Sequence, residues 1–502
     1  MANLLFDALF GRHIGKDTPF LLLPDRGDIT HNAFLQLAGR YAHALTELGL
    51  KPGDRVCVQI DKSPEALAVY AACVQAGLVF LPLNPGYTAS EVSYFLQDSG
   101  AGLFLCPDAN AAGLKPVTEA QLETLNADGS GSFADRAAKL PATFETVARA
   151  GNDLAALLYT SGTTGRSKGA MLTHENLLSN TQTLIEEWHF SSGDILIHAL
   201  PIFHTHGLFV ATNVTLLAGG AALFLAKFDL DAIIAAMPRA TVLMGVPTFY
   251  TRLLSDPRFT RELTAQMRLF ISGSAPLLTE THQDFEALTG HRILERYGMT
   301  ETNMNTSNPY SGERRAGTVG HPLPGVELKI TDPESGAALA QGEIGSIEVR
   351  GPNVFVGYWQ MPEKTAQELR QDGFFITGDL GKIDADGYVH IIGRGKDMII
   401  SGGHNIYPKE VELVLDAQPG MLESAVIGVP DDDLGEAVVA VLVAKDRGGA
   451  GLDIAAIKVA IAPLMARYKQ PRLYVVATAL PRNTMGKVQK NLLRAEHKAL
   501  MR

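Results

Sequence analysis

Short apolar runs alternate with segments of helical period along most of the chain. The run VCVQI at 56–60 precedes a helical pattern at 63–77, and LAALLYT at 154–160 leads into a polar loop. Further along, VLMGVP at 242–247 precedes a second helical pattern, and LFIS at 269–272 runs into GSAPL. Repeated strand–loop–helix units predict an α/β fold whose sheets are covered by helices. In such folds ligands collect at the loops that leave the carboxyl ends of the strands.

The pattern changes after about residue 384, where the segment GYVHIIGRGKDMIISGG is rich in glycine. We predict a large N-terminal α/β domain of several subdomains over residues 1–384 and a small mobile α+β domain over 385–502. Asp384–Gly387 is the candidate hinge and Asp384 its named residue, because glycine beside short polar residues absorbs large dihedral changes. A polar stretch at 124–136 is predicted to be a surface loop. The expected elements of the small domain are a helix at 408–416, strands at 423–430 and 437–445, a helix at 453–467 and a strand at 473–477.

Composition and charge narrow the class of protein. A chain of 502 residues is too long for one core. Its formal net charge of −11 argues against nucleic acid as a partner, because phosphate-backbone binding needs a basic face. Cys57, Cys73 and Cys106 are widely spaced, which fits a reducing compartment rather than a disulfide framework or a zinc site. With no signal or transit pattern and no apolar run of membrane-spanning length, we expect a cytoplasmic protein without a membrane partner.

The loop YTSGTTGRSKG at 159–169 is the first candidate for chemistry. Its backbone N–H groups, hydroxyls and Lys168 suit the capture of phosphate. A Walker motif is excluded, because Ser167 precedes this lysine and Gly169 follows it. Thr173 is the predicted N-cap of the next helix, which would place the loop between a buried strand and a helix N-terminus.

Together with four later motifs, this loop resembles the superfamily of adenylate-forming enzymes, the acyl-CoA synthetases with their luciferase and peptide-synthetase relatives. The resemblance covers almost the whole chain, and five motifs in this order are specific where one alone is not. It implies that a carboxylate attacks the α-phosphate of ATP, that pyrophosphate leaves, and that a thiol then takes the acyl group, with ATP, Mg²⁺ and coenzyme A involved. The later motifs are YGMTE at 297–301, TGDLG at 377–381, GRGKD at 393–397 and PRNTMGKVQK at 481–490.

The resemblance also implies a role for individual residues. Lys487, Lys168 and Glu301 would be catalytic, and Glu301 with Thr160 would hold Mg²⁺, which prefers oxygen ligands. Gly402 and Gly403 would line the channel for the pantetheine arm of coenzyme A. The nucleotide-binding residues would be Thr160, Ser161, Gly162, Thr163, Thr164, Gly165 and Lys168 at the phosphates, Gly273, Ser274, Ala275, Arg296, Tyr297, Gly298, Met299 and Thr300 around the adenine, and Asp379, Arg394 and Lys487 at the ribose and α-phosphate.

Three potential cations point to the acid that is activated. Arg296 precedes the adenine tyrosine, and His206 and Arg252 could approach the same pocket, together with Ser274. An arginine does not suit a fatty-acid tail, but its planar guanidinium binds a second carboxylate bidentately, so we predict a short diacid. The surrounding segments PIFHTHGLFVATNVTL, MGVPTFYTRLL and ERYGMTETNMNTSNPY resemble the malonyl-CoA synthetases of the superfamily, which implies malonate as substrate. Methylmalonate would be tolerated, because a small substituent changes discrimination by only about 1–3 kcal/mol.

Several alternatives stay open at this stage. Arg296 could pair with Glu295, Arg252 could face solvent, and the pair His204 and His206 suits gating or packing better than metal binding. The chain could also be a monocarboxylate–CoA synthetase, an amino-acid-adenylating or luciferase-like relative, or a nucleotide-binding scaffold. Acetylation of Lys487 would remove its charge, so a protein acetyltransferase and a deacetylase are expected partners.

Overall fold

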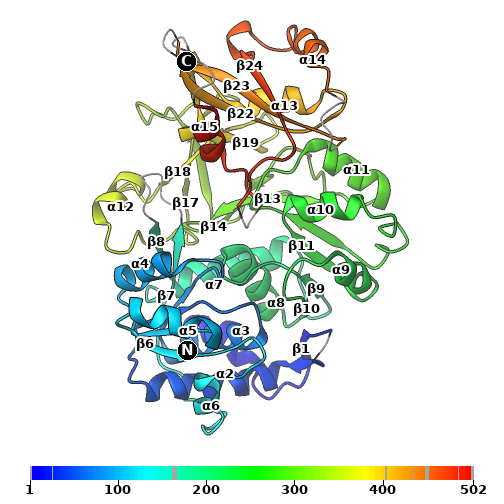
Figure 1. Cartoon of the computed structure of the whole chain (residues 1–502). Helices are drawn as coiled ribbons and strands as arrows, with labels where there is room; N and C mark the ends of the chain where they lie inside the picture. Colours follow the sequence, from blue (N-terminus) through cyan, green and yellow to red (C-terminus); the bar gives the residue numbers. More distant parts are fainter. Residues whose placement is uncertain are drawn as a thin grey trace. The chain divides into compact units, whose positions relative to one another are not determined.

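The computed structural model of the chain describes residues 3–24, 26–160, 167–401, 404–431, 434–446, 452–483 and 486–498. The chain forms two compact units (Figure 1). The first unit comprises Met1–Glu327 with Val349–Phe375, and the second comprises Leu328–Glu348 with Ile376–Arg502. The predicted domain boundary at 384/385 stays a prediction, because a hinge is defined by motion whereas these units follow packing.

Two sheets build the first unit, and most neighbouring strands in them run parallel, as the alternating pattern predicts. In sheet order, the six-stranded sheet consists of β6 (Gln121–Thr124), β5 (Leu103–Cys106), β3 (Arg55–Val58), β4 (Val79–Pro82), β7 (Leu154–Thr160) and β8 (Lys168–Thr173). The nine-stranded sheet consists of β15 (His321–Pro322), β14 (Asn303–Ser307), β13 (Leu294–Met299), β12 (Leu269–Ser272), β11 (Val242–Gly245), β9 (Ile195–His198), β10 (Ala221–Phe224), β1 (Pro19–Leu22) and β2 (Ile29–Thr30).

Helices pack on these sheets, and α3 is buried over its full length. Its Tyr70 contacts Phe80 of β4 and Phe209, so the helix contributes to the core of the unit. The helical segments of the unit are α1 (Leu4–Leu9), η1 (Gly11–His13), α2 (His31–Glu47), α3 (Pro64–Ala76), α4 (Ala89–Ser99), α5 (Asp108–Leu114), η2 (Lys115–Val117), α6 (Ser132–Ala137), α7 (His174–Glu187), η3 (His206–Thr212), α8 (Asn213–Ala218), α9 (Leu230–Ala236), η4 (Met237–Arg239), α10 (Pro247–Leu254), α11 (Thr279–Thr289) and α12 (Pro362–Glu368).

The surroundings of the candidate phosphate loop differ in one respect from the prediction. Thr173 does cap α7, with a reciprocal bond from Asn176. However, the strand β8 intervenes between the loop and this helix, and it pairs antiparallel with β7 from Leu154 to Thr160. The expectation of a loop directly before a helix N-terminus was therefore wrong. The cation Lys168 is fixed by the start of a strand instead.

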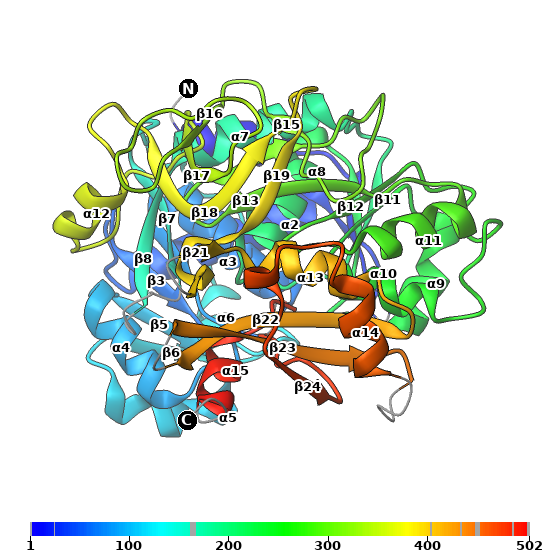
Figure 2. The same ribbon diagram turned by 90° about the horizontal axis from the view of Figure 1, so that it is seen from above.

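The second unit contains a four-stranded sheet and a second sheet with helices on both faces (Figure 2). Because strand side chains alternate, one face of the second sheet packs on α13 and α14 and the other face on α15. The elements are β16 (Glu327–Thr331), β17 (Gly345–Arg350), β18 (Phe375–Ile383) and β19 (Val389–Arg394) in the first sheet, β20 (Ile399–Ser401), β21 (His404–Ile406), β22 (Met421–Asp431), β23 (Gly435–Ala444) and β24 (Leu473–Ala477) in the second, and η5 (Gly395–Asp397), α13 (Pro408–Asp416), α14 (Ile454–Ile461), η6 (Arg467–Lys469) and α15 (Lys490–His497).

Two predicted elements need correction. The helix expected at 453–467 ends at Ile461, because Pro463 lacks an N–H group and disfavours helical geometry in the residue before it. The stretch 124–136 is not a loop throughout, since its last residues from Ser132 onward belong to α6.

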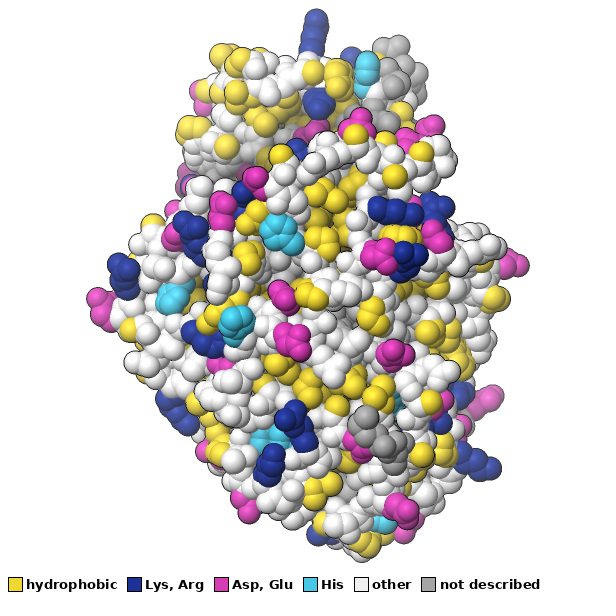
Figure 3. Space-filling view, turned by 180° about the vertical axis from the view of Figure 1, so that it is seen from behind, with side chains coloured by type: hydrophobic (Ala, Val, Ile, Leu, Met, Phe, Trp, Pro, Cys, Tyr) yellow, Lys and Arg dark blue, Asp and Glu magenta, His cyan; other side chains and the backbone are white. Residues whose placement is uncertain are grey.

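Within the described ranges, no helix has the length and apolar character to cross a bilayer. On the face that Figure 3 draws, Lys and Arg side chains are interspersed with Asp and Glu. On this face the basic side chains therefore form no continuous basic surface, and the chain as a whole has a net charge of −11.

Candidate functional site

The carboxyl ends of four neighbouring parallel strands, β9, β11, β12 and β13, carry the residues predicted for the acid pocket. Arg296 lies on β13 and is only 4% exposed. Its guanidinium lies against the backbone of Gly273, which follows β12. A Cβ atom at this glycine would come within 2.4 Å of the guanidinium carbon of Arg296. The glycine therefore makes room for the arginine.

The charge of Arg296 has no acidic partner among the described residues. Its Nε and Nη2 atoms are buried without a hydrogen bond. Burial lowers the pKa of this guanidinium to about 9, although nearby Tyr250 opposes the shift. The alternative that Arg296 pairs with Glu295 is excluded, because the carboxylate of Glu295 lies 3.1 Å from Nδ1 of His282 instead. Adjacent residues of a strand face opposite sides of the sheet.

His206 and Ser274 lie beside this arginine. Nδ1 of His206 is 3.2 Å from Oγ of Ser274, while Nε2 of the histidine is buried without a partner in the described part of the chain. Burial lowers the pKa of His206 well below its usual value, and Arg296 lowers it further. The imidazole is therefore neutral at pH 7 and leaves one ring nitrogen for a ligand. Ser274 has φ +70°, a strained conformation of the kind that often marks functional sites.

Tyr297 is placed by a local irregularity of β13. The register between β13 and β14 shifts between Tyr297 and Gly298, and such bulges re-aim side chains. At Gly298 a Cβ atom would lie 1.9 Å from the carbonyl oxygen of Asn303, so only glycine fits there. The glycine of the predicted adenine segment thus has a structural reason. The role of Tyr297 in adenine binding stays a prediction.

A second cluster connects the predicted phosphate and metal residues. Nζ of Lys168 lies 3.1 Å from Oε2 of Glu368 and 4.1 Å from the centre of the Tyr358 ring. The Tyr358 hydroxyl lies 2.6 Å from Glu368 and 3.1 Å from Glu301. Oγ1 of Thr160 completes the cluster 3.3 Å from Oε1 of Glu301. The structure therefore brings Thr160, Lys168 and Glu301 together.

Sequence reasoning missed Tyr358 and Glu368. The Tyr358 hydroxyl has one proton for the two carboxylates of Glu301 and Glu368. Desolvation is the main reason why the pKa of Tyr358 is raised, and the two negative charges raise it further. Desolvation alone would raise the pKa of Glu368, but bonds from Lys364, Tyr358 and Lys168 outweigh it and lower the pKa. For Glu368, the sequence offered one signal: its i,i+4 spacing from Lys364, because residues so spaced meet on one face of a helix.

The cluster suits a magnesium ion held jointly with phosphates. Glu301 and Thr160 present two oxygen ligands side by side. In the parts of the chain that the structure describes, no group of three or more His, Cys, Asp and Glu side chains could hold a metal. Mg²⁺ commonly takes one or two carboxylates and completes its shell with phosphate and water. The residues present therefore fit this ion, with the ligand phosphates supplying the rest.

The predicted ribose residues pair with each other in the second unit. Asp379 and Arg394 are opposite residues of β18 and β19, and Nε of Arg394 lies 2.9 Å from the carboxylate of Asp379. Lys487 lies within electrostatic range of both. Desolvation lowers the pKa of Lys487, and Arg394 lowers it further, while Asp379 opposes the shift. The structure thus brings these three predicted residues together.

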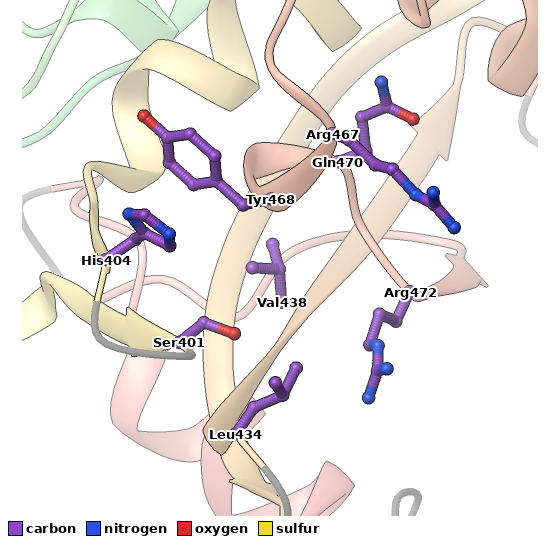
Figure 4. A pocket seen from close by; sticks show the side chains of 8 residues that line it. All are labelled: Ser401, His404, Leu434, Val438, Arg467, Tyr468, Gln470 and Arg472. Atoms are coloured by element: carbon purple, nitrogen blue, oxygen red, sulfur yellow. The ribbon is translucent and has the colours of Figure 1, made fainter.

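The second unit also contains a pocket of about 460 Å³ (Figure 4). His404 and Tyr468 stack there with their ring centres 4.4 Å apart. Arg467 and Arg472 line the pocket, and Arg472 pairs with Asp431 at 3.1 Å. Aromatic rings and arginines suit a planar, anionic ligand. The remaining lining residues are Ser401, Leu434, Val438 and Gln470.

Other predicted residues lie apart or outside the described chain. Arg252 is exposed on α10, with its guanidinium 5.1 Å from the ring centre of Phe228. The carboxylate of Asp384 accepts hydrogen bonds within its own turn and lies 2.9 Å from Nε2 of His390, so its role as a hinge stays a prediction. Ser161, Gly162, Thr163, Thr164 and Gly165 of the loop, and Gly402 and Gly403 of the pantetheine segment, lie outside the described residues.

Buried polar and charged side chains gathered at and after the carboxyl ends of parallel strands, such as Arg296, His206 and Glu301, are typical of ligand-binding α/β enzymes. The chain belongs to the family of AMP-binding enzymes: residues 14–359 match the AMP-binding enzyme model, and residues 410–487 match the AMP-binding enzyme C-terminal domain.

Solved structures and curated relatives agree with this family. An ATP-bound structure of MatB from Rhodopseudomonas palustris is 55% identical, with a TM-score of 0.97 and 100% of both chains covered. A malonate–CoA ligase from Arabidopsis thaliana is 34% identical, covering 89% of this chain and 78% of the relative. A feruloyl-CoA synthase from Amycolatopsis is 35% identical, covering 93% of each chain.

The Tyr358 hydroxyl provides a test of the phosphate cluster. Tyr358→Phe removes a hydrogen bond to a charged group, so we expect the free energy of unfolding to fall by about 1.5–3 kcal/mol in urea titrations. We also expect weaker binding of Mg–ATP, measured by calorimetry, because Glu368 and Lys168 lose their fixed positions. Ser424→Ala is the control, since it removes a 2.6 Å hydroxyl–carboxylate bond to Asp416 in the second unit. Equal ATP affinity in both variants would contradict a role of Tyr358 at the nucleotide.

Proposed function

We propose that this protein is an ATP-dependent ligase that joins malonate to coenzyme A through malonyl-adenylate and releases AMP and pyrophosphate. One observation carries the choice of acid: the buried guanidinium of Arg296 has no acidic partner among the described residues. A buried charge of this kind is costly unless a counter-charge reaches it. The second carboxylate of a short diacid supplies that counter-charge.

The acid pocket binds and orients the diacid. Arg296 pairs with the distal carboxylate, and neutral His206 and Ser274 contribute hydrogen bonds beside it. The other carboxylate of malonate is then free to attack the α-phosphate. Gly273 lets the guanidinium of Arg296 lie directly against its backbone, since a Cβ atom there would clash with it.

The nucleotide residues neutralise the charge that moves toward pyrophosphate. Lys168 and the loop before it hold the β- and γ-phosphates, and Glu301 with Thr160 holds Mg²⁺. When bound, Mg²⁺ supplies Lewis-acid stabilisation of the phosphate oxygens. Asp379 and Arg394 bind the ribose, and Lys487 supplies positive charge to the α-phosphate in the adenylation step.

Coenzyme A is the thiol substrate that follows adenylation. The pocket of Figure 4 supports this proposal, because its stacked rings and two arginines have the chemistry that an adenine nucleotide with several phosphates requires. Ser401 and His404, which line it, flank in sequence the residues Gly402 and Gly403, which were predicted to line the pantetheine channel.

Among the curated relatives, overall identity alone does not choose the acid. A malonate–CoA ligase and a feruloyl-CoA synthase are almost equally similar to this chain, at 34% and 35% identity. The buried guanidinium of Arg296 supports malonate over ferulate, because ferulate has no second carboxylate for it. An amino-acid substrate would need an acidic residue for its ammonium group, and the described pocket offers arginine and histidine instead.

ATP–pyrophosphate exchange tests the acid directly. We expect exchange with malonate, weaker exchange with methylmalonate, and little with acetate, propionate or a medium-chain fatty acid. Each acid is assayed with and without coenzyme A. Exchange that favours monocarboxylates would leave adenylation in place and refute the malonate assignment. No exchange with any acid would indicate a nucleotide-binding scaffold.

Arg296→Ala tests the anchor for the second carboxylate. By analogy with a broken buried ion pair, we expect kcat/KM for malonate to fall by about 3–5 kcal/mol in transition-state stabilisation. Arg252→Ala removes an exposed cation of α10 and serves as the comparison variant. A loss in Arg252→Ala as large as in Arg296→Ala would show that Arg252 also contacts the acid. A loss below about tenfold in Arg296→Ala, some 1.4 kcal/mol, would show that this guanidinium is not the anchor.

We place the enzyme in the cytoplasm and propose that acetylation of Lys487 by a protein acetyltransferase switches it off and a deacetylase restores it. Acetylation removes the positive charge that adenylation needs. We expect chain acetylated at Lys487 to lose pyrophosphate exchange and to regain it after deacetylation. Mass spectrometry that finds this lysine unmodified under all growth conditions would contradict the switch.

A further inference from the structure

A partly buried lysine, Lys62, lies outside all the motifs discussed so far. It follows β3 and precedes Ser63, the N-cap of α3. Its Nζ lies 2.9 Å from Nδ1 of His198, 2.6 Å from the carbonyl oxygen of His198 and 4.3 Å from the centre of the Phe224 ring. Among the described residues, no carboxylate pairs with it. The amine of Lys62 is therefore bonded to the buried His198 and not to an acid, which indicates a role other than an ordinary ion pair.

The contacts of His198 determine which ring nitrogen carries the proton. His198 ends β9 and is 1% exposed. Its Nε2 lies 2.9 Å from the carbonyl oxygen of Gly207, which only accepts hydrogen bonds. Nε2 is therefore protonated, and Nδ1 accepts a hydrogen bond from Lys62. Burial lowers the pKa of His198 well below its usual value, and Lys62 lowers it further, so the ring is neutral.

The bond to Gly207 reaches the acid pocket. Gly207 follows His206 at the start of η3, which is a π-helix. A Cβ atom at Gly207 would lie 2.0 Å from the carbonyl oxygen of Pro201. π-Helices are rare and occur frequently at functional sites. His198 holds the carbonyl of the Gly207–Leu208 peptide, so the backbone directly after His206 is anchored. The imidazole of His206 lies opposite Ser274, with Nδ1 3.2 Å from Oγ.

We propose that Lys62 is a positioning residue for acid specificity, which acts through His198 and Gly207 to fix His206 beside the distal carboxylate of the substrate. This inference rests on the proposed function. Lys62 itself does not need to touch the acid. Lys62 and the Gly207 carbonyl together select the tautomer of His198, by donating to Nδ1 and accepting from Nε2. Without Lys62, Nδ1 loses its donor and only the Gly207 carbonyl selects this tautomer, so the bond from Nε2 to Gly207 is held less firmly.

The experiment compares Lys62→Met, which removes the donor, with Lys62→Gln, which keeps a donor without the charge. The readout is the ratio of kcat/KM for malonate to that for propionate, with the KM for ATP measured in parallel. We expect the ratio to fall by about tenfold in Lys62→Met, mainly through the KM for malonate, since small misplacements of a positioning group have effects of this order or larger. Lys62→Gln restores most of the ratio, and the KM for ATP stays within about twofold.

Two further variants complete the test. Lys51→Met, at an exposed lysine just before β3, controls for the loss of a lysine charge in this region. His198→Phe breaks the same chain of bonds, so it lowers the ratio like Lys62→Met, and the double variant is no worse than either single variant. His198→Phe also serves as the test if Lys62→Met does not fold.

The outcomes separate this inference from the proposed function. If the unmodified enzyme shows no exchange with malonate, the proposed function fails before Lys62 is considered. If malonate is used and Lys62→Met or His198→Phe loses activity or stability with an unchanged ratio, the lysine is purely structural and the inference is wrong. Equal ratios in Lys62→Met and Lys62→Gln, or additive effects in the double variant, would also overturn positioning through the hydrogen bond.

Discussion

The uncompensated positive charge of Arg296 is the constraint on which the acid pocket depends. Removing such a charge from water costs several kcal/mol, and a protein retains it only where a counter-charge is supplied. Gly273 lets the guanidinium lie against the backbone, and strand alternation directs Glu295 to the other side of β13. An anionic substrate supplies the missing counter-charge, so its binding offsets the desolvation cost that Arg296 imposes on the free enzyme. A pocket built in this way discriminates against acids that lack a second carboxylate, because they leave the charge unpaired.

The nucleotide side solves the opposite electrostatic problem. ATP carries several negative charges. The protein cations that bind it therefore benefit more from fixed positions than from lacking an acidic partner. Lys168 accordingly has a carboxylate partner in Glu368, and Tyr358 bridges that carboxylate to Glu301. Arg394 likewise pairs with Asp379 in the second unit. Paired cations hold their geometry before the ligand arrives, which is the condition for effective electrostatic stabilisation.

Local pattern predicted local structure well. The strand Leu154–Thr160, the helix Pro408–Asp416 and the cap at Thr173 have the bounds that periodicity and capping chemistry indicated. The strand β8 was missed, because a short segment that follows a glycine-rich loop and contains a glycine has little β-signal of its own. Motif resemblance named Lys168 and Glu301, but it could not name Tyr358, which joins their neighbourhoods from a segment far along the chain. Contacts of this kind depend on the tertiary fold and leave no mark in the periodicity.

The acid pocket and the nucleotide site draw largely on different sheets: Arg296 lies on β13 of the nine-stranded sheet, and Thr160 and Lys168 lie on β7 and β8 of the six-stranded sheet. His198 and Ser274 lie at or just after the ends of parallel strands, where the ligand-binding residues of α/β folds collect. Relatives of nearly equal identity, named for malonate and for ferulate, fit this division, since specificity resides in sites placed on a shared fold. A change of acid therefore requires more than the replacement of Arg296. Gly273 would still leave space for a guanidinium, and the contacts of His206 would still hold its imidazole opposite Ser274.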